Sequence, residues 1–464
     1  MRADRADRWD GAGGGELADA GGWGVSSEVV WPRLSLQRAG VSLIDCDHRT
    51  PPAASDGFPY IAIPQLKDGH VDLNGVRRIA PSDYADWTRK LKPRANDVIV
   101  VRRCNSGDSA VVPQGLECAI GQNLVVLRST GSAVEPRFLR WLVRGPDWWD
   151  QVAKFINVGA VFDSLRCKDI PNFELTVPPI DAQQEIAALL DSLDDRIALL
   201  RETNTTLEAI AQAVFKSWFV DFDPVRAKMA GRAPEGMDEA TAALFPDSFG
   251  VSARGEVPAG WPVLPIGDAV EAVGGTTPDT KTAAFWAPAV HCWTSPKDLS
   301  GAAAPVMLDT ERKISDAGLA KIGSGLLPAG SLLMSSRAPI GYLTLTQVPV
   351  AINQGYIGML PGGRLSPLYL LFWCRANMDA IKGRANGSTF MEISKKAFRP
   401  IPALVPPALL IDKFDGIAGS LFARLVENER QAQTLTTLRD TLLPRLVSGQ
   451  LRLPDAEGLA HAPA

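Results

Sequence analysis

The chain contains the same unit twice. Residues 157–219 and 385–447 align at a constant offset of 228 without a gap, so that Val177-Pro178-Pro179 recurs as Val405-Pro406-Pro407. Weaker matches continue upstream at offsets of 227 to 234. A protein built as two copies of one module presents two similar surfaces, and such a pair suits a two-part target better than a single catalytic pocket does. We therefore predict an internal repeat with a pseudo-twofold relation between its copies.

Length and composition narrow the class of protein. A chain of 464 residues is long enough for two or three domains, and 46% hydrophobic with 22% charged residues is ordinary for globular proteins. It has no apolar run of about 18 residues, which predicts no membrane span. The six cysteines are scattered and the four histidines are not clustered, which predicts reduced thiols, a cytoplasmic location and no metal site. The Gly-rich residues 1–28 are predicted to be a disordered tail.

The distribution of net charge along the chain follows the repeat. The net charge of -4 resolves into +3 for residues 30–178, +4 for residues 258–405 and -7 for residues 179–257, with the remainder at the two ends. Positive charge in both modules is compatible with binding to nucleic acid, although surface charge also serves solvation alone. The acidic segment suits either protein docking or a solvated helix face, because carboxylates such as Asp191, Asp194 and Asp195 would repel phosphate.

Each repeat begins with about 150 residues of mixed pattern. Short apolar runs such as 97–101 and 124–127, with counterparts at 332–334 and 356–359, are punctuated by Gly, Pro, Asn and Asp. This pattern predicts the strands of a compact α/β (α+β) domain.

Each repeat ends in a predicted long helix. Apolar or small residues alternate at spacings of four and three, which is the period of a coiled coil. These positions are Ile186, Leu190, Leu193, Ile197, Leu200, Leu207, Ala211, Val214 and Trp218, then Phe414, Ala418, Leu421, Leu425, Ala432, Leu435, Leu442 and Leu446. Asn204 and Asn428 occupy the same seams, and only Arg439 is discordant. We predict an antiparallel pair in which Asn204 faces Asn428 and fixes the register; the alternative is that each helix packs on its own domain.

Several sequence segments are similar to those of one known family. Val177-Pro178-Pro179-Ile180-Asp181-Ala182-Gln183-Gln184-Glu185-Ile186, Phe215-Lys216-Ser217-Trp218-Phe219 and Leu443-Pro444-Arg445-Leu446-Val447-Ser448-Gly449 closely resemble type I restriction-modification specificity subunits. The resemblance covers about residues 30–455 and does not account for the N-terminal extension.

The resemblance implies a non-catalytic DNA-recognition subunit with two tandem target recognition domains. It implies double-stranded DNA and two methylation subunits as partners, and two restriction subunits where these exist. S-adenosylmethionine, ATP and Mg²⁺ would belong to the partner subunits, so no cofactor is expected in this chain. The expected segments are a tail (1–28), the first recognition domain (29–178), a central spacer helix (179–223), a linker (224–257), the second recognition domain (258–405), a C-terminal spacer helix (406–450) and a tail (451–464).

Motifs of enzymes that bind nucleotides or metals are missing from the sequence. There is no GxGxxG after a strand, no GxxxxGK[ST] loop, no HExxH and no GxSxG. Asp223-Pro224-Val225 lacks the second proline and the aromatic residue that adenine methyltransferases use. A self-sufficient methyltransferase is therefore disfavoured, and the alternative function is a protein-interaction scaffold of the same architecture that no longer recognises DNA.

Candidate DNA contacts are basic and amide side chains in matching loops of the two modules, because Arg and Lys bind phosphate and guanine while Asn and Gln bind adenine. They are Arg102, Arg103, Asn105, Gln122, Asn157, Arg166 and Lys168 in the first module, and Lys297, Arg337, Gln354, Asn386, Ser388, Lys395 and Lys396 in the second. Gln122 and Gln354 occur in both copies, so hydrogen bonding within the fold explains them equally well. For Asn157 and Asn386, one position out of step in the alignment, a turn role is favoured.

Overall fold

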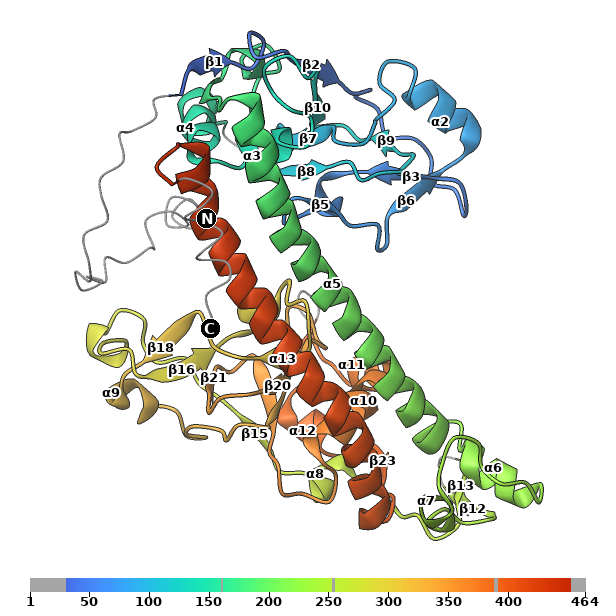
Figure 1. Ribbon diagram of the computed structural model, residues 1–464. Helices are drawn as coiled ribbons and strands as arrows, with labels where there is room; N and C mark the ends of the chain where they lie inside the picture. The colour runs from blue at the N-terminus through green and yellow to red at the C-terminus, as the bar shows by residue number, and fades with distance from the viewer. Residues whose placement is uncertain (1–30, 160–161, 253–254, 388–390, 452–464) are drawn as a thin grey trace. The chain divides into compact units, whose positions relative to one another are not determined.

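A computed structural model describes residues 31–159, 162–252, 255–387 and 391–451 (Figure 1). The predicted tails therefore lie outside the described residues, apart from position 451. Two compact units are present. One contains the chain up to residue 190 together with the residues from 440 onward, and the other contains residues 191–439.

The first unit is built on a four-stranded antiparallel sheet and a three-stranded sheet. The larger sheet has the order β2 (Val41–Asp45), β10 (Leu124–Ser129), β7 (Val98–Val101) and β8 (Ser109–Val111). The smaller has the order β6 (Arg77–Ile79), β3 (Phe58–Ile61) and β9 (Ala119–Ile120). Two strand pairs complete it: β1 (Arg33–Ser35) with β11 (Glu174–Thr176), and β4 (Leu66–Lys67) with β5 (His70–Val71). Its helices are α2 (Pro81–Trp87), α3 (Leu139–Leu142) and α4 (Pro146–Phe155), with 3-10 turns η1 (Ile63–Gln65) and η2 (Ile170–Asn172).

The second unit repeats this topology. Its larger sheet has the order β15 (Ala272–Gly274), β22 (Tyr356–Met359), β19 (Leu332–Ser335), β20 (Leu343–Thr346) and β17 (Val306–Met307). Its smaller sheet has the order β18 (Arg312–Ile314), β16 (His291–Thr294) and β21 (Ala351–Ile352), and β14 (Val263–Pro265) pairs with β23 (Pro402–Leu404). Helices α8 (Ile266–Ala269), α9 (Asp316–Leu319), α10 (Pro367–Ala376), α11 (Met378–Lys382) and α12 (Lys395–Phe398) and 3-10 turns η3 (Ala283–Phe285) and η4 (Pro296–Leu299) complete it. The predicted tandem α/β architecture is confirmed.

Continuous apolar runs in the sequence become the central strands. All four residues of β7 and all four of β19 are buried. Each lies between two antiparallel neighbours, and both of its faces are covered. This explains why these runs do not alternate between apolar and polar residues, as a half-exposed strand would.

The two long helices have equal length. Helix α5 spans Ile180–Phe219 and helix α13 spans Ala408–Val447, each with 40 residues, and their bounds differ by the repeat offset of 228. At 1.5 Å per residue each is roughly 60 Å long. The start of α5 is fixed to the first unit, because the buried Gln183 accepts from the N–H of Glu135 and donates to the carbonyls of Ala133 and Pro178.

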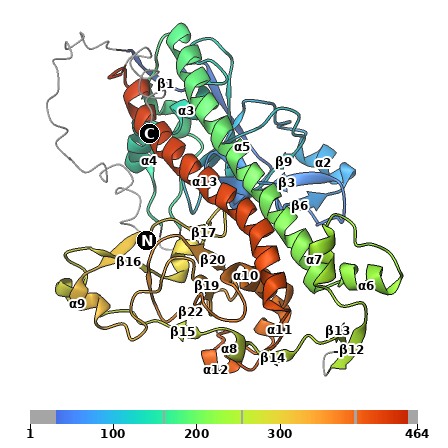
Figure 2. The same cartoon turned by 60° about the horizontal axis from the view of Figure 1, so that its bottom comes forward.

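Within the second unit α5 and α13 contact each other in antiparallel fashion, side by side in both ribbon views (Figure 1 and Figure 2). Asn428 Nδ2 donates to Asn204 Oδ1 at 3.0 Å, and Arg439 Nη1 donates to Asp194 Oδ1 at 2.5 Å. Residue numbers therefore increase along α5 as those of their partners decrease along α13, as an antiparallel pair requires. Between these two polar pairs lies a small apolar cluster made of Ile197, Leu200, Ala432 and Leu435.

Arg439 and Asp194 correct the expectations from sequence. Arg439, discordant in the heptad pattern, is 1% exposed, and Asp194, expected on a solvated or docking face, is also 1% exposed. A charged residue can interrupt the apolar pattern of α13 here because a buried carboxylate on α5, Asp194, pairs with it.

The predicted segment boundaries near residue 220 also differ from the structure. Helix α5 ends at Phe219, and Phe222 adopts a left-handed φ of 58° as the cap of a new helix, α6 (Asp223–Met229). The predicted linker therefore contains α6, α7 (Glu239–Ala243) and the hairpin β12 (Phe249–Ser252) with β13 (Gly255–Pro258). Pro224 lies in the first turn of α6, where a backbone N–H would have no partner within the helix, so proline is well tolerated there.

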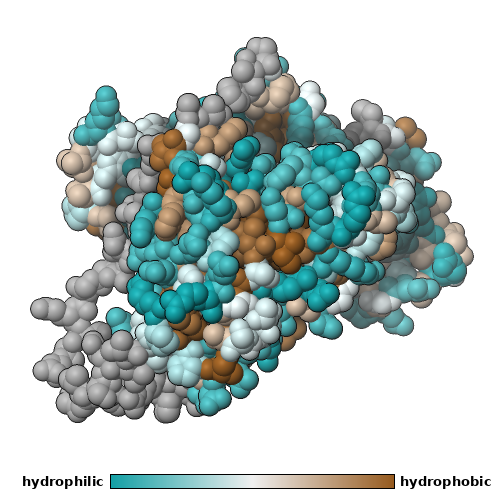
Figure 3. All heavy atoms as spheres, turned by 90° about the horizontal axis from the view of Figure 1, so that it is seen from above, coloured by the Kyte–Doolittle hydropathy of each residue, from teal (hydrophilic) through white to brown (hydrophobic). Residues whose placement is uncertain are grey.

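The surface is mixed in polarity. Figure 3 shows a face on which hydrophilic side chains surround small hydrophobic patches. In the described part of the chain, we find no helix whose length and apolarity would let it cross a bilayer.

Candidate nucleic-acid interface

Three loops of the first module meet at the end of β7. The N–H of Arg102 donates to the carbonyl of Asn123 before β10 at 2.8 Å, and the N–H of Leu165 donates to the carbonyl of Arg102 at 2.8 Å. Asn157 and Ser164 exchange backbone hydrogen bonds and close the third loop. Backbone bonding therefore holds segments from three distant parts of the module in one place.

The second module builds the same junction. The N–H of Ser336 donates to the carbonyl of Gly355 at 2.8 Å, and the N–H of Ile393 donates to the carbonyl of Ser336 at 3.0 Å. Residues Cys104 and Ala338, two positions after the equivalent Arg102 and Ser336, both adopt a left-handed φ, of 72° and 52° respectively. A positive φ in a non-glycine residue is uncommon, so its recurrence marks one loop conformation used twice.

The two asparagines are structurally equivalent. Asn157 pairs with Ser164, and Asn386 pairs with Glu392, which is the counterpart of Ser164 at the offset of 228. The ungapped alignment was therefore wrong at this loop, where it placed the two asparagines one position apart. The loop of the second module is one residue shorter between the paired positions. The side chain of Asn157 also donates to the carbonyls of Phe155 and Ser164 at 3.4 Å, which is a turn contact.

The glutamine side chains are held by matching threonines. Gln122 Nε2 donates to Thr50 Oγ1 at 2.9 Å, and Thr277 Oγ1 donates to Gln354 Oε1 at 2.7 Å. Both glutamines are exposed. One threonine bond restrains the orientation of an amide and uses only part of its hydrogen-bonding capacity. Each amide is thus positioned by the fold and still available to a ligand.

The basic residues of the first module fall into two groups. Arg102 is half-buried and donates Nη1 to the carbonyl of Leu165 at 3.3 Å, which leaves it a structural role. Arg166 Nε donates to Asp169 at 2.7 Å, so its charge is partly compensated. Arg103 and Lys168 are exposed, as is Asn105 in the same loop as Arg103.

In the second module, Lys297 and Arg337 line one hollow of about 410 Å³, together with Ser295, Tyr342 and Asn353. Each has a glutamate at 3.6 Å, Glu311 for Lys297 and Glu392 for Arg337. The sequence gives no hint that these two candidates, 40 positions apart, share a surface. The fold brings them together because η4 follows β16 and the Arg337 loop follows β19.

The remaining candidates of the second module lie on or near α12. Lys395 and Lys396 are exposed in its first turn, and the Lys395 side chain lies against Gly274 at the end of β15. Asn386 is exposed. Ser388 lies outside the described residues.

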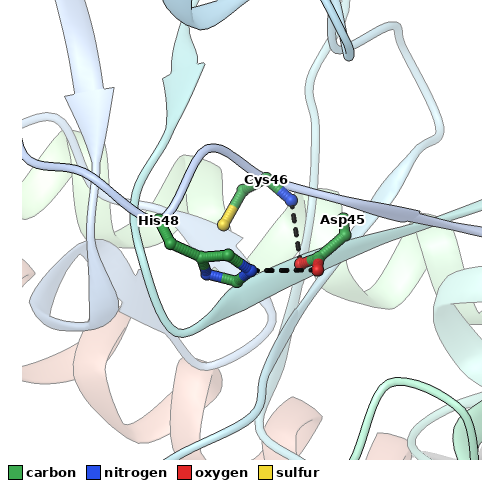
Figure 4. Close-up of side chains that lie close together, drawn as sticks. All are labelled: Asp45, Cys46 and His48. Atoms are coloured by element: carbon green, nitrogen blue, oxygen red, sulfur yellow. Dashed lines mark hydrogen bonds and ion pairs between the residues drawn. The ribbon is translucent and has the colours of Figure 1, made fainter.

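Asp45, Cys46 and His48 form a compact group at the end of β2 (Figure 4). Their ligand atoms lie within 4.8 Å of one another, a cluster that the scattered histidines of the sequence did not predict. Asp45 accepts from the N–H of Cys46 and pairs with His48 Nε2, both at 3.0 Å. Burial, followed by the charge of Asp45, raises the pKa of the Cys46 thiol to about 11. We interpret the group as a hydrogen-bonded corner of the loop, because Asp45 already bonds both of the other residues.

Threonines 50 and 277 are the main residues that sequence reasoning missed. A signal existed, because both belong to a Thr-Pro dipeptide that recurs near the repeat offset (Thr50-Pro51 and Thr277-Pro278). The recurrence indicates a shared turn, but only the structure shows that its hydroxyl holds the glutamine.

Comparison with known proteins assigns the family. The model of the type I restriction modification DNA specificity domain matches the chain twice, at residues 49–209 and 258–416. The chain is 31% identical over 387 residues to the MjaIX specificity subunit of Methanocaldococcus jannaschii, covering 82% of this chain and 83% of the relative. It is 27% identical over 377 residues to the HindI specificity subunit of Haemophilus influenzae, covering 72% and 81%. The S subunit of a type I system from M. genitalium shares the fold, with a TM-score of 0.50 at 15% identity over 91% of this chain and 98% of that one. The chain therefore belongs to the type I restriction-modification DNA specificity family.

Proposed function

We propose that this chain is the non-catalytic subunit that gives a type I restriction-modification complex its DNA specificity. Each module binds one half of a bipartite, gapped site on double-stranded DNA. The modules correspond to residues 29–178 and 258–405, and the long helices lie between and after them.

One observation carries the proposal: the same three-loop junction, with an exposed glutamine held by a threonine, is built once in each module. A duplicated site matches a two-part target, since each copy meets one half of it. An amide with fixed orientation suits an adenine edge, which offers a donor and an acceptor together.

The remaining candidates are assigned by exposure. Arg103, Lys168, Lys395 and Lys396 are exposed cations next to the junction and suit phosphate oxygens. Lys297 and Arg337 suit the same role in the hollow that they share. Base contacts that differ between the half-sites are expected where the modules differ, at residues 45–49 against 273–276.

The long helices suit a spacer role. The antiparallel contacts between α5 and α13 support a coiled coil in which the Asn204–Asn428 pair fixes the register. With the repeat, they support a pseudo-twofold arrangement that offers equivalent positions to two methylation subunits. The charge of -7 over residues 179–257 favours protein over DNA as the partner of this region.

In this proposal the partner subunits carry out the catalytic steps. Methylation subunits supply S-adenosylmethionine, and restriction subunits, where present, supply ATP- and Mg²⁺-dependent steps. The complex acts on genomic DNA in the cytoplasm of a bacterium or archaeon.

The test is a methylome. The full chain is co-expressed with its methylation subunit in a host without adenine methylation, and modified adenines are mapped by single-molecule sequencing. A single two-part motif with a fixed gap is expected. Replacing residues 29–178 by those of a relative should change one half of the motif only. A stable complex that leaves the genome unmodified would contradict DNA recognition and favour a scaffold.

A further inference from the structure

One guanidinium of the second module lies over a tryptophan ring. Cζ of Arg312 is 3.6 Å from the centroid of the Trp286 ring and 5.3 Å from that of Trp293. The two indoles are 5.2 Å apart and nearly perpendicular, at 88°. Stacking of this kind orients the planar guanidinium and occupies one of its faces, while the N–H donors around its edge stay available.

The stack lies beside the glutamine of the junction. Arg312 begins β18 and pairs with Trp293 in β16, and β16 runs parallel to β21, which ends two residues before Gln354. Trp286 Nε1 donates to the carbonyl of Asp279 at 3.1 Å. The Thr277 that holds Gln354 lies two residues before this carbonyl. The stacked arginine and the oriented amide therefore belong to one end of one sheet.

Arg312 carries an uncompensated charge. It is exposed, and no ion pair or side-chain hydrogen bond joins it to any residue that the structure describes. Its neighbours in sequence behave differently: Glu311 is 3.6 Å from Lys297, and Lys313 is 3.4 Å from Asp309. A rigid, exposed arginine without a carboxylate partner suits an acceptor supplied from outside the chain.

The equivalent arginine of the first module is used within the fold. Arg77 begins β6 and pairs with Tyr60, as Arg312 pairs with Trp293. Arg77 Nη1 donates to the carbonyl of Pro51 at 2.8 Å. The two equivalent arginines therefore differ, because Arg77 donates to an acceptor within its own module and Arg312 has no such acceptor among the described residues.

In the first module a different arginine, Arg49, lies over an indole ring, and two carboxylates pair with its charge. Cζ of Arg49 lies 4.5 Å from the Trp87 ring, while Arg49 Nη2 lies 2.8 Å from Asp47 and 3.0 Å from Asp86. Two carboxylates outweigh one guanidinium, so this group carries a net charge of -1 that repels DNA. The stacked arginines of the two modules thus present opposite local charge balance.

We propose that Arg312 is a DNA contact of the second half-site, donating its N–H edge to oxygen or nitrogen acceptors of the duplex. The inference rests on the proposed function and deepens it. The acceptor is either the O6/N7 edge of a guanine or a phosphate oxygen, and these two predict different behaviour.

The test uses the full chain in complex with its methylation subunit. Arg312→Gln removes the charge, Arg312→Lys keeps the charge but loses the planar fork, and Lys313→Gln is the matched control on the same strand. Binding of a duplex with the wild-type motif is measured across a salt series, and the methylome of each variant is mapped. Arg312→Gln is expected to weaken binding on the order of 10- to 100-fold, with Lys313→Gln close to wild type.

The pattern of loss identifies the acceptor. If the acceptor is a guanine, both Arg312 variants lose selectivity at one base of the motif. That base lies in the half-site that stays unchanged when residues 29–178 are exchanged. For a phosphate contact, Arg312→Gln weakens all duplexes equally and lowers the salt slope by about 1, while Arg312→Lys retains most affinity. An Arg312→Gln complex with wild-type affinity and motif overturns the inference, as does an equal loss in Lys313→Gln. A wild-type complex with no motif refutes instead the proposed function.

Discussion

Breaking the ion pair between Asp194 and Arg439 from one side is expected to destabilise the helix pair strongly. Both side chains are 1% exposed, and Nη1 lies 2.5 Å from Oδ1. Substituting Arg439→Met leaves a buried carboxylate without its counter-charge. Breaking a buried pair from one side costs about 3–5 kcal/mol, because the desolvation of the remaining charge is no longer offset.

The expected magnitude is large enough to measure in the full chain. The unit that holds the pair spans residues 191–439. For a unit of this size 1 kcal/mol shifts Tm by about 2–4 °C, so Arg439→Met should lower its transition by roughly 6–20 °C. The double variant Asp194→Leu/Arg439→Met removes both charges and should recover most of this loss or exceed wild-type stability, since apolar replacements of buried pairs are often neutral or stabilising.

Differential scanning calorimetry, with helix content followed by circular dichroism, measures these shifts. Arg430→Met is the matched control on the same helix, because its guanidinium is 57% exposed and 3.9 Å from Glu427, and a change below about 1 kcal/mol is expected. A shift in Arg439→Met no larger than in this control would refute the buried-pair reasoning. A double variant as unstable as the single one would show that packing, not charge, causes the loss.

Three further outcomes are expected. Asn428→Leu should lower Tm by removing the donor that the buried Asn204 Oδ1 accepts from, at a cost of about 1–3 kcal/mol, while Leu at both positions should restore it in calorimetry. Burial raises the pKa of Asp415, so the contribution of this group to stability is fully present below the unfolded value of 3.8 and is lost as pH rises through the folded pKa. Asp415→Asn should therefore raise Tm at about pH 7 and give no gain at about pH 3.5. Gly275→Val should abolish soluble folding of the second module, because a Cβ there would lie 1.7 Å from a backbone carbonyl oxygen, whereas Gly323→Val, with open space around it, should give wild-type soluble yield.

Much of the architecture was predictable because it is encoded locally. A heptad pattern over about forty residues specifies a long helix wherever it occurs, and the observed bounds of α5 and α13 repeat the offset found by alignment. The duplicated strands follow from apolar runs of four residues, and the facing of Asn204 and Asn428 followed from matching two heptad seams.

The roles of individual polar residues were decided by the tertiary structure. Arg102 and Arg103 are adjacent in sequence, yet one bonds within the fold and the other is exposed. Arg439 looked like a defect in its heptads until the fold placed it against Asp194, 245 residues away.

Arg312 shows the same division most clearly. Its sequence neighbourhood resembles that of Arg77, but the stacking on Trp286 requires η3 and β18 to meet in space. Periodicity is a property of neighbouring residues, so one sequence determines helices, strands and the repeat. Burial, pairing and charge balance depend on residues that only folding brings together, and they decide which side chains remain available to a partner.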